Sequence, residues 1–225
     1  MSISNGFSEL AKQLLRYGDE QKERLQQILG EQNYTQQTLI DYLNHEGSLT
    51  RRAAVHALSL IGDMDAVPPL IESLKGDDPT ICLDAEQALW AIWFRSGDES
   101  VNTMLEEGAN HTKEKRYQES IEVLTEVIRI APDFAEAYNQ RAIAYFLLDE
   151  WRKSIEDCEK AVELNPYHFG AVAGIGQCYL RLGKLREAID AFQKALELNP
   201  NLYGIAHTVV QIQKALHEYF EEDDE

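Results

Sequence analysis

The sequence predicts an all-α fold in which helical hairpins stack into one continuous right-handed α-solenoid. Two internal periods carry this prediction. In the second half of the chain, Pro132, Pro166 and Pro200 recur at one constant interval, the longer period. In the first half, the apolar pattern around Leu39 returns around Leu70, which defines a slightly shorter period. Units of this size bury their apolar faces only against neighbouring units, so the two periods predict a stacked array.

The first half is expected to hold a cap and one short array. Residues 1–34 contain two brief apolar helical patterns that are too short to be stable alone, which suits an N-terminal helical cap. Residues 35–98 contain two units of the shorter period. Pro68 and Pro69 fit the start of a helix, where a backbone N–H has no partner inside the helix.

Three units of the longer period are expected over residues 99–203. Small residues recur at one column, Gly108, Ala142 and Gly176, where two helix backbones can approach closely. Gly176→Leu should therefore overpack the crossing and cost roughly 1–3 kcal/mol. Residues 204–220 should form a capping helix, and the acidic residues 221–225 a disordered tail.

The columns of the second half resemble the tetratricopeptide repeat. Each unit has a large residue early in its first helix (Met104, Tyr138 and Val172), then the small column already named, then the closing proline. The shorter units of the first half resemble HEAT repeats of the short bacterial type, including those called phycobilisome-lyase-like. These resemblances imply helix pairs whose first helices line a concave groove. In the HEAT-like half, Arg52 and Asp63 resemble part of that family's polar ladder.

Composition limits the classes of partner. The net charge of −18 is spread along the chain, which argues against nucleic acid or an anionic membrane as the main partner. Cys82, Cys158 and Cys178 lie in helical patterns and form no C-x-x-C, so buried thiols in a reducing compartment are expected. With no apolar segment of signal-peptide or membrane-span length, the sequence predicts a cytoplasmic protein.

No constellation of catalytic or metal-binding residues is apparent. The phosphate-binding, dinucleotide-binding and zinc-protease motifs are absent, and the six histidines share no ligand spacing with one another or with a cysteine. His111 occupies an interior column and is expected to be a hydrogen-bonded core imidazole. We therefore expect a protein that is not an enzyme and has no catalytic residue, metal or cofactor.

Helical spacing nominates the residues of the expected groove. They lie on the first helix of each longer unit and form a surface that is apolar along its centre. These residues are Asn102, Leu105, Ala109, Asn139, Gln140, Ile143, Phe146, Ala173, Gln177, Leu180 and Arg181.

Such a groove suits an amphipathic helix or an extended peptide of another protein. The expected function is that of a protein-interaction scaffold, adaptor or assembly factor that binds its partner reversibly. Phe146→Glu or Leu105→Glu should then abolish partner capture without unfolding the protein.

One ligand class is expected to be excluded. The tetratricopeptide subgroup that grips the carboxylates of heat-shock-protein C-termini uses two lysines, two asparagines and an arginine. None of the matching positions in this chain carries a cation. These positions are Leu105, Ala109, Gln140, Gly170 and Gly174.

Three alternatives remain open at the level of sequence. The HEAT-like half could handle a linear tetrapyrrole, as lyases with similar repeats do, with Asp63, Asp65 and Asp84 facing the chromophore. The groove could be filled by the chain's own N-terminal helices or tail. The open ends of the array could also pair two copies of the protein.

Overall fold

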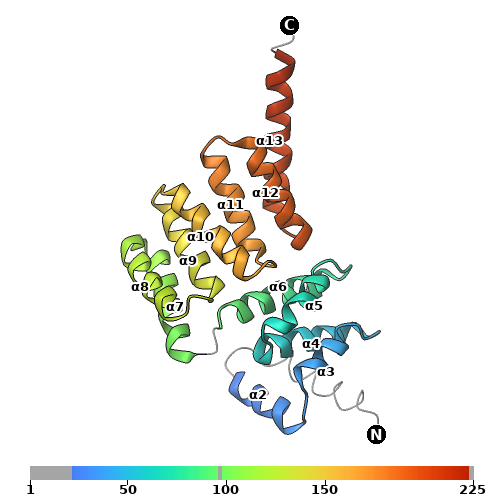
Figure 1. Ribbon diagram of the computed structural model, residues 1–225. Coiled ribbons are helices and arrows are strands. Elements are labelled where there is room, and N and C mark those ends of the chain that lie inside the picture. The colour runs from blue at the N-terminus through green and yellow to red at the C-terminus, as the bar shows by residue number, and fades with distance from the viewer. Residues whose placement is uncertain (1–21, 96–97, 223–225) are drawn as a thin grey trace. The chain divides into compact units, whose positions relative to one another are not determined.

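The computed structural model describes residues 22–95 and 98–222, and every regular element in these residues is a helix (Figure 1). The predicted all-α fold is therefore confirmed. The predicted pattern before Gly18 and the last three residues of the predicted acidic tail lie outside the described part. The α-helices are α2 (Lys22–Glu31), α3 (Gln36–Tyr42), α4 (Ser48–Ile61), α5 (Val67–Ser73), α6 (Pro79–Trp93), α7 (Glu99–Lys113), α8 (Tyr117–Ile130), α9 (Ala135–Leu147), α10 (Trp151–Leu164), α11 (Phe169–Arg181), α12 (Leu185–Leu198) and α13 (Tyr203–Glu222), with a 3-10 helix η2 at Met64–Ala66.

The chain divides into two compact units between Trp93 and Phe94. Each unit is built from helices that pack against their neighbours in sequence. The predicted boundaries at 34/35, 98/99 and 203/204, and the predicted continuity of the array from one unit into the next, stay predictions.

In the first unit α3 packs on α4, α5 packs on α6, and α4 packs on α6 across the two hairpins. Pro68 and Pro69 stand in the first turn of α5, as predicted. The Thr35 hydroxyl caps α3 by accepting from the N–H of Thr38. Leu58 and Leu89 are completely buried, so the shorter period corresponds to a shared core.

Polar contacts tie together helices of this first unit. Arg52 Nε donates to Asp84 Oδ2 at 2.5 Å and joins α4 to α6. Gln36 Nε2 donates to Asp63 Oδ1 at 2.6 Å, while the Asp63 N–H donates to Gln36 Oε1 at 2.8 Å. Arg52 and Asp63 therefore do not contact each other in one ladder. Arg52 bonds to Asp84 and Asp63 bonds to Gln36, and neither partner belongs to the predicted ladder.

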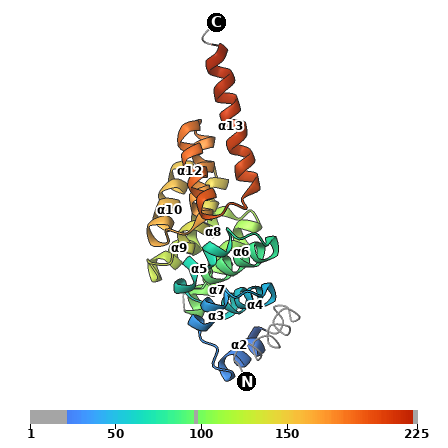
Figure 2. The same cartoon turned by 90° about the vertical axis from the view of Figure 1, so that its right-hand side faces the viewer.

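The second unit consists of the antiparallel pairs α7–α8, α9–α10 and α11–α12, followed by α13 against α12 (Figures 1 and 2). The pairs cross closely where small residues recur. A Cβ added at Gly108 would lie 2.6 Å from Leu124 Cγ, and one at Gly176 would lie 2.5 Å from the Phe192 ring. Leu124 and Phe192 are completely buried, so neither can move aside cheaply.

The turns inside the three pairs share one backbone feature. Lys115, Asp149 and Gly183 occupy equivalent positions of successive units, and their φ angles are 63°, 59° and 72°. This left-handed conformation ends the first helix of each pair and lets the chain reverse into the second. Glycine adopts it without strain, and only the third unit uses glycine.

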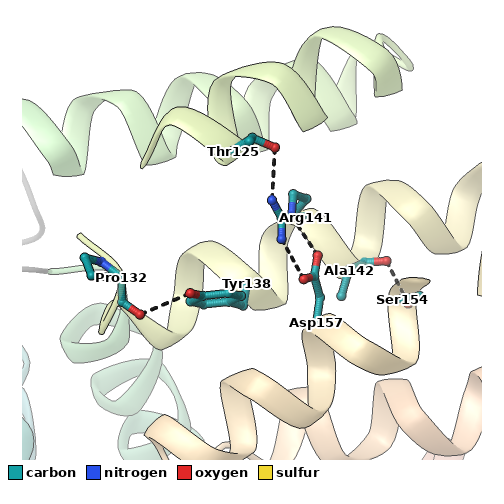
Figure 3. Close-up of polar contacts among 7 residues, drawn as sticks. All are labelled: Thr125, Pro132, Tyr138, Arg141, Ala142, Ser154 and Asp157. Carbon is teal, nitrogen blue, oxygen red and sulfur yellow. Dashed lines mark hydrogen bonds and ion pairs between the residues drawn. The ribbon is translucent and has the colours of Figure 1, made fainter. Parts of the chain in front are cut away.

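Arg141 connects three consecutive helices of the second unit (Figure 3). Its Nε and Nη2 donate to the two carboxylate oxygens of Asp157 on α10, both at 2.8 Å. Its Nη1 donates to Thr125 Oγ1 on α8 at 3.0 Å. The hydrogen bonds with Asp157 raise the pKa of the Arg141 guanidinium. Close by, Ser154 Oγ donates to the Ala142 carbonyl at 2.8 Å, which fixes the α9–α10 crossing (Figure 3).

Helix α13 closes the core of the last pair. Val209 and Ile212 are buried in a cluster with Ala188 and Phe192 of α12. The opposite face is open, with Tyr203 76% and Val210 58% exposed. In both views α13 runs on beyond α12, and it continues to Glu222, two residues into the segment predicted to be a disordered tail (Figures 1 and 2).

His111 differs from its prediction. Its Nε2 lies 3.6 Å from Glu107 Oε1, and its buried Nδ1 has no hydrogen-bond partner among the described residues. The expected fully hydrogen-bonded imidazole is therefore not formed, because the column predicts burial but not the chemistry of the neighbours.

Candidate functional site

The residues nominated for the groove fall into two groups, one buried in the core and one accessible at the surface. Leu105 is completely buried, Ala109 is 6% exposed and Asn139 is 3% exposed. Leu105 belongs to the core cluster that also holds Val101 and Leu124. These three nominated side chains support the fold and do not offer a surface to a ligand. Leu105→Glu would place a charge in that core, so the expectation that this substitution leaves the fold intact is wrong.

The accessible nominated residues gather on α9 and α11. On α9, Ile143 is 39% exposed and Phe146 is half-buried; their neighbour Leu147 is 44% exposed. Ile143 and Leu147 are four residues apart, which places them on one face of the helix. On α11, Arg181 is exposed, whereas Ala173, Gln177 and Leu180 are partly buried. Asn102 and Gln140 are also partly buried.

One contact joins the two helices at this surface. The Arg181 guanidinium carbon lies 5.7 Å from the centroid of the Phe146 ring, within the range of a cation–π interaction. The ring holds the guanidinium near α9 while its N–H donors remain available. We use the name α9/α11 face for Ile143, Phe146, Leu147 and Arg181. This face offers apolar surface beside a fixed positive charge.

A buried polar network lies at the start of the same two helices. The ring Nδ1 of His168 accepts from the Ala171 N–H at 3.1 Å and so caps α11. The ring proton is therefore on Nε2, which donates to Glu136 Oε2 at 2.7 Å. Glu136 Oε1 accepts from Asn139 Nδ2 at 3.1 Å and from Gln140 Nε2 at 2.6 Å.

This network explains two nominated residues and was missed by sequence reasoning. Asn139 and Gln140 each donate from the side chain to Glu136 on the same helix, so they orient its carboxylate and are less available to a ligand. The side chains of Glu136 and His168 are completely buried. Their separation of 32 residues, close to the repeat period, was the available signal: it places them at the starts of successive first helices.

The cysteines are unsuited to nucleophilic chemistry. Cys82, Cys158 and Cys178 are buried thiols that form no disulfide, as predicted. Burial raises the pKa of the Cys158 thiol and that of the Cys178 thiol, so both stay protonated near neutral pH. Within residues 22–95 and 98–222, no three histidine, cysteine or acidic side chains gather in a way that could hold a metal ion.

Two of the three carboxylates considered for a chromophore, Asp63 and Asp84, have structural partners. Asp63 accepts from Gln36 and from the Asp65 N–H at 2.9 Å, which caps η2. Asp84 is bonded to Arg52. Nothing in this arrangement favours the tetrapyrrole alternative.

In the described ranges, no helix combines the length and the apolar character needed to span a bilayer.

The repeats match two known families. The tetratricopeptide repeat family matches residues 135–168 and 173–202, and the HEAT repeat family matches residues 9–90. The chain therefore carries tetratricopeptide repeats (TPR) and HEAT repeats. A TPR repeat-containing protein of Rhizobium etli is 32% identical over 107 residues, which are 47% of this chain and 52% of that protein. The mitochondrial import receptor subunit TOM70 of Homo sapiens is 36% identical over 70 residues, which are 29% of this chain and 12% of the receptor.

The chain therefore spans about half the length of one of these relatives and a small part of the other. Among solved structures, the first TPR of Spaghetti (RPAP3) is 30% identical, with a TM-score of 0.50. The match covers 52% of this chain and 93% of that domain. That domain is bound to the HSP90 peptide SRMEEVD.

This likeness overturns the exclusion of heat-shock-protein tails. The exclusion rested on five positions that lack a cation in this chain, and it is wrong because a similar TPR domain is bound to such a peptide. The five positions do not account for every cation on the surface. Arg181 follows Gly174 by two helical turns on the same face of α11, where it can meet a carboxylate.

Proposed function

We propose that this protein is a non-enzymatic interaction scaffold whose TPR helices bind a short segment of another protein at the α9/α11 face. The supporting observation is the Arg181–Phe146 pair beside exposed Ile143 and Leu147. Apolar side chains that lie together on a surface and are bordered by polar residues often mark an interaction site. Peptide ligands commonly combine apolar anchors with one charged contact, and this face offers both.

The ligand that we propose first is an acidic tail of the heat-shock-protein type. The support is the likeness to the first TPR of Spaghetti, which is bound to SRMEEVD. In such a tail, an aliphatic residue would rest on Ile143 and Leu147, and a carboxylate would accept hydrogen bonds from the Arg181 guanidinium. A charge-assisted contact of this kind contributes roughly 1.5–3 kcal/mol.

The test is a fluorescence-anisotropy titration of the full chain with labelled SRMEEVD. Arg181→Ala should weaken binding by about tenfold or more, since about 1.4 kcal/mol corresponds to a factor of ten. Ile143→Ser should weaken it by a smaller factor because it removes apolar contact area. The matched control is Arg152→Ala, which removes an exposed cation from α10 and should leave the affinity unchanged.

Two results would contradict the proposal in different ways. If the wild type binds the peptide and both variants bind it equally well, the α9/α11 face is not the site. If the wild type does not bind the peptide, the proposed ligand is wrong. Cross-linking mass spectrometry on the tagged protein in its native cell would then identify the segment that occupies the face.

A further inference from the structure

We propose that a cleft in the first unit binds an arginine or lysine side chain of a partner protein. The cleft has a volume of about 370 Å³ and lies where the hairpins α3–α4 and α5–α6 meet. Residues of both hairpins line it, so the site exists only when the two hairpins are stacked. It lies outside the TPR helices and does not depend on the function proposed for them.

Part of the lining of the cleft is apolar. Leu43, Pro69 and Ile81 belong to its lining, and Leu43 and Ile81 are 8% and 6% exposed. The volume falls near the lower end of the range of ligand pockets, roughly 300–1,000 Å³. It therefore suits one or two side chains and not a whole helix. The methylene stem of an arginine or lysine would lie against these apolar side chains while its charged end stays near the carboxylates.

The charges around the cleft favour a cation. Glu72, Asp77 and Asp78 supply three carboxylates, and Arg51 supplies one guanidinium. Arg51 Nη1 already donates to the backbone carbonyls of His45 and Glu46, at 2.8 and 2.9 Å. An incoming cation would thus meet an excess of negative charge beside apolar side chains, whereas an incoming carboxylate would meet repulsion.

The three carboxylates differ in how free they are to bind. Asp78 Oδ1 caps α6 by accepting from the N–H groups of Thr80 and Ile81. Glu72 accepts from Lys75 Nζ at 2.9 Å, and both side chains are well exposed. Exposed ion pairs contribute little, so a ligand cation can replace Lys75 at small cost. Glu72 and Asp77 are therefore the carboxylates that would hold the ligand.

The experiment uses the full chain and two heptapeptide amides with fluorescein on the N-terminal amine, fluoresceinyl-GSLRLSG-amide and the same peptide with citrulline in place of arginine. Citrulline keeps the shape of arginine but removes its charge. The arginine peptide should bind saturably and at least tenfold more tightly than the citrulline peptide. Glu72→Gln combined with Asp77→Asn should weaken the arginine peptide by about tenfold and leave the citrulline peptide unchanged.

A charge-matched control separates a local site from the overall negative charge. Glu31→Gln combined with Asp65→Asn removes two exposed carboxylates from the same unit but outside the cleft, and it should leave the affinity unchanged. Circular dichroism melts of both double variants would establish that they fold. The proposal is overturned if the control weakens binding as much as the cleft variant does, if citrulline binds as well as arginine, or if no saturable binding occurs. Arg181→Ala should not alter binding of this peptide, which keeps the two proposals separable.

Discussion

Single side chains decide how closely two helices of a pair can cross. At Gly176 the missing Cβ leaves room for the Phe192 ring, which is completely buried. Gly108 leaves room in the same way for Leu124. The middle pair has Ala142 in that column, opposite the smaller Cys158, so one methyl group is accommodated there. The size of the two facing residues is thus matched in each unit.

Gly176→Ala should therefore lower the free energy of unfolding by roughly 1–3 kcal/mol, because its Cβ would overlap the Phe192 ring. The measurement is a urea denaturation followed by circular dichroism. Gly204→Ala in α13 is the matched control, since a Cβ there meets nothing within 4 Å. The control should be neutral or slightly stabilising, as alanine favours helix over glycine. Equal midpoints for both variants would contradict this account of the crossing.

Residue-level prediction from sequence succeeded where the repeat period carried the information. The small column was predicted because it recurs once in every longer unit. The exposure of individual groove residues was not predicted, and Leu105 shows why. Helical spacing assigns a residue to one face of its own helix, whereas burial depends on the residues that other helices bring against it. Leu105 meets such neighbours, and Ile143 remains open.

At the scale of the element, the turn inside each helix pair has the same backbone conformation, although a different residue adopts it in each pair. Lys115, Asp149 and Gly183 all have positive φ. For a residue with a side chain, this conformation costs about 1–2 kcal/mol, with less for aspartate because its short polar side chain can bond locally. The strain should therefore be largest at Lys115.

Replacing Lys115 with glycine should stabilise the protein by about 1 kcal/mol, because the strain is removed while the turn keeps its shape. Gly183→Ala should have the opposite effect and a similar size, since it introduces a Cβ at a φ of 72°. Paired thermal melts of the two variants measure this. Destabilisation by Lys115→Gly would show that the lysine side chain contributes more than its backbone conformation costs.

The presence of whole helices was easier to predict from the sequence than the exposure of single residues. The predicted helix starts at Pro68 and Pro69 and the predicted final helix are present, because the signals for them are local in sequence. The end of α13 was predicted less well. Helix α13 runs to Glu222 although an acidic run argued for an earlier stop, since a helix can continue through charged residues when its apolar face is anchored earlier.

For the whole molecule, continuity between the two arrays is still a prediction from the sequence. One shorter period after Leu70 and Leu74, the apolar pattern falls on Val101 and Leu105 in the first helix of the TPR array, and no linker rich in glycine, serine or proline separates the two arrays. A single superhelix should give small-angle X-ray scattering of one rigid particle at both low and moderate salt. A profile that requires two independently moving lobes would refute continuity.

The sequence by itself determined the helical class, the two repeat families and the columns that pack. These properties follow from periodic patterns that each unit carries within its own residues. Only the tertiary structure decided which surface is accessible, which charges are already paired, and where a cleft remains. The Arg181–Phe146 contact, the Glu136–His168 bond and the cleft above Leu43 each join side chains of different helix pairs. Their geometry is set by how neighbouring pairs stack, and no single repeat encodes it.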